Sequence, residues 1–117
     1  YRMIFKQGDI VKVNLNPAKG HEQGNYRPAL VINRDDIFLP GGINIILPIT
    51  THNGTYKKQF ALEVELDNST LTKGYVLCFQ PRTLDLNARN AIFVERAPKC
   101  IIEQCCDYAS QILNAMY

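Results

Sequence analysis

Up to residue 95, the apolar residues of this 117-residue chain fall into short runs, each closed by Gly, Pro, Asn or Asp. The clearest run covers residues 59–66, where Phe60, Leu62, Val64 and Leu66 alternate with residues that are mostly polar. Alternation of this kind predicts a strand with one buried face. A chain punctuated in this way can build a small sheet.

The same pattern predicts about six short strands, at residues 10–15, 28–32, 43–49, 59–66, 74–79 and 91–95. Pro48, near the end of the third, suggests an edge strand or a bulge, because proline cannot donate to a ladder. After Pro98 the apolar residues recur at helical spacing: Ile101, Cys105, Tyr108, Ala109, Ile112 and Met116. This spacing predicts a helix to about Met116. We therefore expect a mainly β (β+α) fold, a small twisted β-barrel with a C-terminal helix packed on it, forming one domain over residues 1–117.

Composition is that of an ordinary folded protein, with 46% hydrophobic and 21% charged residues and a net charge of +2. These values exclude a disordered chain and leave only a weak bias toward polyanions. No apolar run approaches the roughly 20 residues of a membrane helix, and no signal peptide is visible, so we expect a cytoplasmic protein without a membrane partner.

The four cysteines, Cys78, Cys100, Cys105 and Cys106, do not have the spacing of a metal knuckle or of a disulfide framework. We expect reduced thiols, as in a cytosolic protein. A zinc site would need further donors, and the two histidines are far away in the sequence. We therefore predict no metal and no cofactor.

A polar loop at residues 17–27 comes directly before a strongly apolar run, which starts after Pro28. Within it His21, Glu22 and Arg27 bring an imidazole, a carboxylate and a guanidinium together in a loop that also contains Gly20 and Gly24. Arg27 precedes proline, so its backbone is biased toward an extended conformation, and its planar fork suits a phosphate. The alternatives are a solvated charge or a salt bridge to Glu22.

Further polar residues stand at two other strand ends. Thr50 and Thr51 follow the run at 43–49, and a threonine hydroxyl can donate to a phosphoryl oxygen. Gln80 and Arg82 follow the run at 74–79, where Arg82 could hold a phosphate or pair with Asp85. None of the common nucleotide-binding, metalloprotease or serine-hydrolase motifs occurs, so spacing alone does not identify a reaction.

Several blocks of the sequence, in order and over nearly its whole length, resemble the MazF/PemK family of toxin endoribonucleases. The blocks are residues 8–11, 16–17, 19–32, 47–50 and 80–85. Their most specific part is the Gly-x-Glu-Gln segment at 20–23 followed by Arg27-Pro28. Two residues depart from the family pattern: His21, where a small hydroxylated residue is common, and Pro81, where an aliphatic residue is common.

The resemblance implies a cytoplasmic toxin of a type II toxin–antitoxin system with an SH3-like, CcdB-like barrel that forms homodimers. Such toxins cut single-stranded RNA (mRNA) at short sequences without a metal, which inhibits translation and growth. The implied partners are the RNA substrate and a cognate acidic antitoxin, and the complex with the antitoxin binds DNA.

The resemblance also assigns roles to residues. Catalysis falls on Arg27, Thr50 and Glu22; RNA binding is expected from His21, Gln23, Asn25, Tyr26, Thr51, His52, Gln80 and Arg82. Tyr56 is a further candidate for holding a base, and Lys57 and Lys58 for lining an RNA groove.

The chemistry needs no nucleophile from the protein, because the ribose 2′-hydroxyl attacks the adjacent phosphate and leaves a 2′,3′-cyclic phosphate. Arg27 and Thr50 would stabilise the growing phosphoryl charge, while Glu22 or His21 is the better candidate for the general base. Two alternatives remain open from the residues alone: a non-enzymatic gyrase poison of the CcdB type, and an SH3-like binding module without activity.

Overall fold

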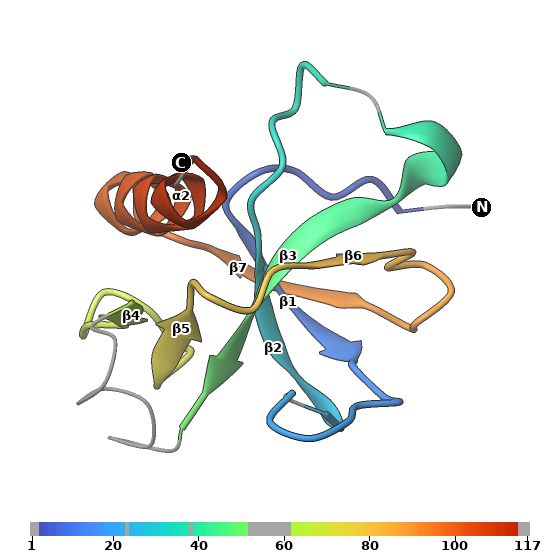
Figure 1. The fold of residues 1–117 in the computed structure, drawn as a ribbon, viewed down its shortest axis with the longest axis horizontal. Coiled ribbons are helices and arrows are strands. Elements are labelled where there is room, and N and C mark those ends of the chain that lie inside the picture. The colour runs from blue at the N-terminus through green and yellow to red at the C-terminus, as the bar shows by residue number, and fades with distance from the viewer. Residues whose placement is uncertain (1–2, 23, 38, 52–61, 115–117) are drawn as a thin grey trace.

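The computed structural model describes residues 3–22, 24–37, 39–51 and 62–114, and in these residues it contains seven strands, one short 3₁₀ helix and one α-helix (Figure 1). The elements are β1 (Asp9–Asn14), β2 (Tyr26–Val31), η1 (Pro40–Gly42), β3 (Asn44–Thr50), β4 (Glu63–Glu65), β5 (Tyr75–Leu77), β6 (Arg82–Leu84), β7 (Ile92–Arg96) and α2 (Lys99–Leu113). The predicted mainly β fold with a C-terminal helix is confirmed. The predicted number of strands is wrong by one, because Arg82 opens a strand of its own instead of ending one.

The strands form one antiparallel sheet in the order β4-β5-β3-β2-β1-β7, with β6 pairing beside β3. In the described residues no ladder joins β4 to β7, so the sheet does not close into a complete barrel. A side chain bridges the two ends of the sheet instead. Glu95 on β7 accepts hydrogen bonds from the backbone N–H groups of Leu71 (3.0 Å) and Thr72 (2.7 Å) in the loop between β4 and β5. At this seam, between β7 and the β4–β5 loop, hydrogen bonds to a carboxylate take the place of backbone pairing between strands.

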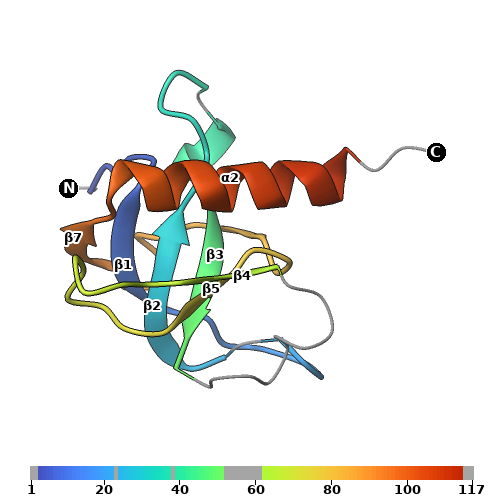
Figure 2. The same ribbon diagram turned by 90° about the vertical axis from the view of Figure 1, so that its left-hand side faces the viewer.

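The sheet separates two hydrophobic cores. Helix α2 lies across one face (Figure 2), where Ile101, Cys105 and Ala109 are buried against the strands. The other face carries a second cluster, made of Phe5, Val11, Val13, Leu15, Ala29, Val31, Ile46, Leu84 and Leu86. Both faces of the central strands are therefore buried, which explains why β1, β2 and β3 are so rich in aliphatic residues.

Helix α2 follows Pro98, as predicted, and ends at Leu113; Met116 lies outside the described residues. Its last turn extends beyond the sheet (Figure 2), which leaves Ile112 and Leu113 36% and 70% exposed. Among the described helices none is long and apolar enough to span a bilayer.

All four cysteines are free thiols, as predicted. Cys78 and Cys105 are fully buried in the core under α2. A hydrogen bond with Cys78, together with burial, raises the pKa of the Cys105 thiol far above its usual range, so this pair behaves as apolar packing.

Pro48 sits in the middle of the sheet, and the prediction of an edge strand there is wrong. Strand β3 pairs with β2 on one side and with both β5 and β6 on the other. Because backbone groups point alternately to the two sides, and because Ile45 bonds toward β2, Pro48 faces the β5/β6 side. If the β5 register continued, Ile46 would face Phe79, but it faces Arg82, three residues further on. The segment between β5 and β6 therefore loops out of the ladder at the place where Pro48 lacks an N–H donor.

Two predicted boundaries change in ways that affect function. Strand β2 starts at Tyr26, so Tyr26 and Arg27 belong to the strand and not to the predicted loop at 17–27. Strand β4 covers only Glu63–Glu65 of the predicted run at 59–66, whose residues 59–61 lie outside the described part. Within β4 the predicted faces are confirmed, because Val64 is buried and Glu65 is exposed.

Candidate active site

Arg27 and Thr50, which the sequence predicts to contact the reacting phosphate, lie near the same end of neighbouring strands. The pairing of β2 with β3 ends at Ala29 and Pro48, and beyond it the strands diverge (Figure 1). Since side chains alternate along a strand, Arg27 lies on the face of Ala29, and Thr50 on the face of Pro48. Both therefore point to the same side of the sheet and flank the place where the strands separate.

Thr50 is only 1% exposed. Its backbone is fixed by pairing with Tyr75 in β5, and Gly74 comes so close that a Cβ atom there would lie 2.3 Å from the Thr50 carbonyl oxygen. The side chain of Thr50 is therefore buried, and its backbone is held rigidly in the strand.

The loop between β1 and β2 is closed at its base by asparagines. Asn16 Oδ1 accepts from the Asn25 backbone N–H at 2.8 Å, and the Leu15 N–H donates to the Asn25 carbonyl at 2.9 Å. Asn25 has a φ of 67°, a conformation that asparagine tolerates better than most residues. Its predicted role in RNA binding is therefore combined with a structural one.

Arginine side chains hold the carbonyl oxygens of this loop. Arg27 Nε donates to Gly24 O (2.7 Å), Arg82 Nη1 to Leu15 O (2.7 Å), and Arg89 Nη1 to both Asn14 O (3.1 Å) and Asn16 O (2.7 Å). Three positive charges thus converge on one end of the sheet through charge–dipole bonds. Arg82 binds the Leu15 carbonyl and not Asp85, which was the alternative left open by the sequence.

The acid/base candidates lie at the outer part of the loop. Glu22 is exposed, and its carboxylate accepts from the Lys19 backbone N–H at 2.8 Å. No ion pair joins it to Arg27 in the described residues, so the salt bridge considered from the sequence does not form. His21 is exposed too, and its carbonyl accepts from Gln80 Nε2 at 3.1 Å. Gln80 thereby ties the loop to the segment between β5 and β6.

The remaining predicted contacts are dispersed around this end of the sheet. Tyr26 is 45% exposed, and its hydroxyl donates to the Asn90 carbonyl at 3.3 Å. Thr51 is exposed just beyond β3. Gln23, His52, Tyr56, Lys57 and Lys58 lie outside the described residues.

Sequence reasoning misses two residues that shape the site, Gly74 and Arg89. In the sequence Gly74 indicates only the start of a strand, and Arg89 only part of a turn. An arginine inside a turn rich in asparagine is a weak signal, because such turns are usually built from small polar residues. Nothing in the sequence indicates which carbonyls Arg89 holds.

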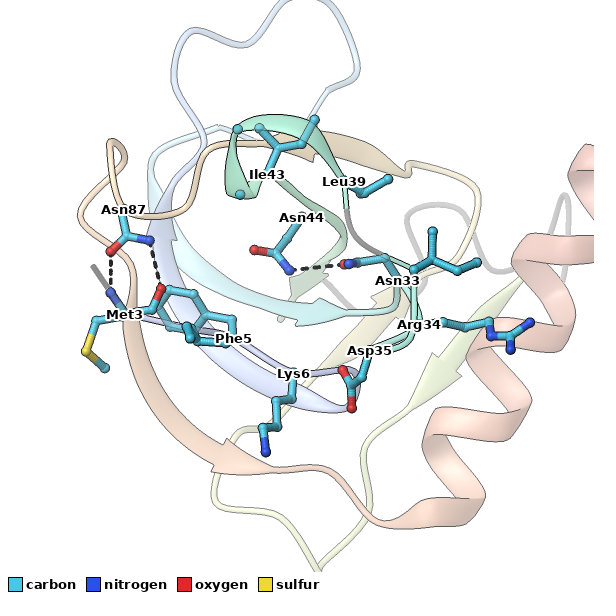
Figure 3. A pocket seen from close by; sticks show the side chains of 14 residues that line it. Met3, Phe5, Lys6, Asn33, Arg34, Asp35, Leu39, Ile43, Asn44 and Asn87 are labelled. Carbon is cyan, nitrogen blue, oxygen red and sulfur yellow. Dashed lines mark hydrogen bonds between the residues drawn. The ribbon is translucent and has the colours of Figure 1, made fainter. Parts of the chain in front are cut away.

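A large cavity of about 710 Å³ opens at the other end of β2 and β3 (Figure 3). Its walls come from the N-terminal segment and from the loop that contains η1. Asn44, 8% exposed, donates from Nδ2 to Asn33 Oδ1 at 3.2 Å inside it. Asn44 and Thr50 are six residues apart on one strand, so this cavity is about 20 Å from Thr50 and separate from the arginine cluster.

No group of three His, Cys, Asp or Glu side chains in the described part of the chain is close enough together to hold a metal ion. The polar groups that converge at the base of the β1–β2 loop are guanidinium donors and backbone carbonyls. Such an arrangement can bind an anion and stabilise negative charge that grows during a reaction.

Residues 6–113 match the family model described as PemK-like, MazF-like toxin of type II toxin–antitoxin system. Among curated relatives, endoribonuclease PemK of Escherichia coli is 33% identical over 111 residues, which cover 94% of this chain and 83% of the relative.

Two solved structures from Deinococcus radiodurans have the same fold. A crystal structure of MazF aligns with a TM-score of 0.83 at 28% identity, covering 96% of this chain and 98% of the other. A crystal structure of MazE-MazF aligns with a TM-score of 0.78 at 28% identity, covering 98% of this chain and all of the matched chain.

Proposed function

Because the chain belongs to the family of PemK-like, MazF-like toxins of type II toxin–antitoxin systems, we propose that it is an endoribonuclease toxin that cuts single-stranded RNA at specific short sequences without a metal ion. The similarity to a relative named endoribonuclease PemK supports the activity. The observation that carries the proposal furthest is the convergence of Arg27, Arg82 and Arg89 at the end of the sheet where Thr50 lies. The comparisons do not favour the gyrase-poison alternative.

The proposed reaction is an intramolecular transesterification. The 2′-hydroxyl of the ribose attacks the neighbouring phosphorus, the bond to the 5′-oxygen breaks, and the products carry a 2′,3′-cyclic phosphate and a 5′-hydroxyl. Negative charge builds up on the phosphoryl oxygens in the transition state. A guanidinium fork at Arg27 and a hydroxyl at Thr50 lower the barrier by stabilising that charge.

Proton transfer belongs to the outer loop in this proposal. Arginine stays protonated at neutral pH, so Arg27 is a charge stabiliser and a poor base. Glu22 and His21 are both exposed at the loop; either can take the 2′-hydroxyl proton, and the pair can return a proton to the leaving 5′-oxygen. Bases on either side of the cut would be held by exposed side chains such as Tyr26, on which an unstacked base can lie.

The family description also defines the biological setting. A toxin of a type II system has a cognate antitoxin, and we propose that this partner presents an acidic segment to the arginine cluster. We further propose that the toxin is a homodimer and that it acts in the cytoplasm, where mRNA is found.

The decisive experiment is cleavage of a long RNA by the purified protein in the presence of EDTA, with mass spectrometry of the ends. We expect cleavage at a short recurrent sequence, with 2′,3′-cyclic phosphate and 5′-hydroxyl ends. Loss of activity in EDTA, or products with a 5′-phosphate, would contradict the proposed mechanism. No cleavage of any RNA would contradict the enzyme assignment itself.

Arg27→Ala tests the site in the same assay. We expect the rate to fall about 10²–10³-fold, the usual cost of removing one donor that stabilises developing charge, while the melting temperature stays close to that of the unmodified protein. Arg34→Ala is the matched control, because Arg34 is an exposed arginine paired with Asp36 on the loop at the opposite end of β2. Equal activity of the two variants would remove Arg27 from the mechanism.

A further inference from the structure

We propose that Arg89 is a positioning residue of the cleavage site: by bonding the carbonyls of Asn14 and Asn16, it fixes the base of the β1–β2 loop and so determines where the acid/base residues stand relative to Arg27. This inference rests on the proposed function. It concerns a residue outside the five sequence blocks named above as most similar to the family pattern, although it lies within the residues 6–113 that match the family model.

Arg89 makes two hydrogen bonds from a single side-chain nitrogen. Its Nη1 donates to Asn16 O at 2.7 Å and to Asn14 O at 3.1 Å, while the Arg89 carbonyl accepts from the Asn14 N–H at 3.2 Å. Main chain and side chain of one residue therefore both hold the end of β1. Asn16, in turn, uses its Oδ1 to hold Asn25 at the start of β2.

The turn that carries Arg89 is a firm support. Leu86 is fully buried, and its carbonyl accepts from the N–H groups of Arg89 (3.2 Å) and Ala91 (3.0 Å). Asp85 Oδ1 accepts from the Ala88 N–H at 3.1 Å. A turn bonded internally at this density keeps the Arg89 Cα in place, so the guanidinium transmits that position to the loop.

The same turn also reaches the second strand of the site, because the Asn90 carbonyl accepts from the Tyr26 hydroxyl. Both chain segments that bound the loop are thus fastened to residues 85–91. Small displacements matter at such a place, since misplacing a catalytic group by about 1 Å can cost about 10²-fold in rate. In the described residues the hydrogen-bond partners of the Arg89 guanidinium are neutral carbonyls, so its positive charge adds to that of Arg27 and Arg82.

The test combines kinetics with hydrogen exchange on the full chain. For Arg89→Ala, we expect kcat on a short fluorogenic RNA to fall about 10²-fold while KM changes less than about threefold, since the contact is made to the loop and not to RNA. Arg89→Lys, which keeps the charge but has a shorter side chain without the planar guanidinium, should lie between. Millimolar guanidinium ion should restore part of the kcat of Arg89→Ala and leave Arg34→Ala unaffected.

Exchange of the Asn25 and Leu15 backbone amides gives a readout that is independent of activity. We expect both amides to exchange faster in Arg89→Ala and Arg89→Lys than in the unmodified protein, while amides of α2 are unchanged. Unchanged exchange and unchanged kcat in a folded variant would overturn the proposal. An effect on KM alone, with a weaker salt dependence, would also overturn it by making Arg89 a phosphate contact. If the unmodified protein cleaves no RNA but the exchange effect is present, the proposed function is contradicted, while the role of Arg89 in holding the β1–β2 loop is supported.

Discussion

At the scale of single residues, Gly74 has no reactive side chain but determines the position of Thr50, which is a proposed catalytic residue. Its φ is +122°, a conformation that side chains rarely adopt, and a Cβ atom would lie 2.3 Å from the Thr50 carbonyl oxygen and 2.9 Å from its carbon. Both atoms belong to the main chain and cannot rotate away. A glycine here lets β5 approach the end of β3 closely enough to hold Thr50.

Gly74→Ala should therefore destabilise the protein and impair cleavage together. We expect a loss of about 1–3 kcal/mol in the free energy of unfolding, the usual cost of a strained backbone conformation, and a fall in kcat because Thr50 is displaced. Gly41→Ala is the control, since Gly41 also has a positive φ (+75°) but a Cβ atom added there would meet no atom within 4 Å, and it lies at the other end of the sheet. Denaturant unfolding and RNA cleavage measure the two effects. Similar loss of cleavage in both variants would show that the contact with Thr50 is irrelevant.

Part of the candidate site can be predicted from the sequence, because some of its residues are recognisable from their own local chemistry. Arg27 before Pro28 and Thr50 after an apolar run are recognisable from local chemistry and from family resemblance. The partners of the arginines are not, because a carbonyl oxygen has no sequence signature. Arg89 contacts Asn14 and Asn16 across more than 70 positions, which only the fold can bring together.

At the scale of elements, the seam between β7 and the β4–β5 loop depends on one carboxylate. Burial raises the pKa of Glu95, but the hydrogen bonds from the Leu71 and Thr72 amides outweigh it, so the pKa lies below its ordinary value of 4.5. A carboxyl whose pKa is lower in the folded state stabilises that state above its unfolded pKa, and this stabilisation is lost as the pH falls through the folded pKa.

We therefore expect the contribution of Glu95 to the free energy of unfolding to be constant at neutral pH. Below about pH 4.5 it should decline as Glu95 takes up a proton. Glu95→Gln should be less stable at neutral pH and should show a shallower acid decline. Glu103→Gln, on the exposed side of α2, is the control. Urea unfolding across the acid range measures all three proteins, and parallel curves for Glu95→Gln and the unmodified chain would contradict the role given to this seam.

Strands with regular alternation or continuous apolar runs are predictable, because the positions of the apolar residues show whether one or both faces are buried. The central strands and β7 fall within one or two residues of their predicted bounds. Strand β6 is not predictable, since Arg82–Leu84 is only three residues long and exists because β3 offers it a partner. The degree of barrel closure is hidden for a similar reason: whether the last strands meet depends on twist over the whole sheet.

At the scale of the whole molecule, the proposed RNA site and the 710 Å³ cavity occupy opposite ends of the central strands, with the core cluster around Val31 and Ile46 between them. Arg27, Arg82 and Arg89 lie at the first end. That end attracts polyanions, and an acidic peptide imitates one. Substrate and antitoxin would thus compete for the same groups.

Charge reversal at Arg82, as Arg82→Glu, should weaken both RNA binding and inhibition by the antitoxin, and the two ligands should displace each other. Arg34→Glu, at the far end, should weaken neither. Competition between labelled RNA and antitoxin measures this, and light scattering at micromolar concentration measures the proposed homodimer. A ternary complex that keeps full affinity for both ligands would defeat the shared site, and a monomer would defeat the dimer.

Pro48 has a consequence for how this fold can change during evolution. A ladder that ran without interruption from β5 into β6 would absorb the three residues that now loop out, and Gln80 would lose its reach to the His21 carbonyl. With proline at the facing position, a mutation that straightened the loop would gain no hydrogen bond from a backbone N–H of residue 48. The irregular segment is thus shielded from drift toward a smoother sheet, and with it the link between the sheet and the loop that carries the proposed chemistry.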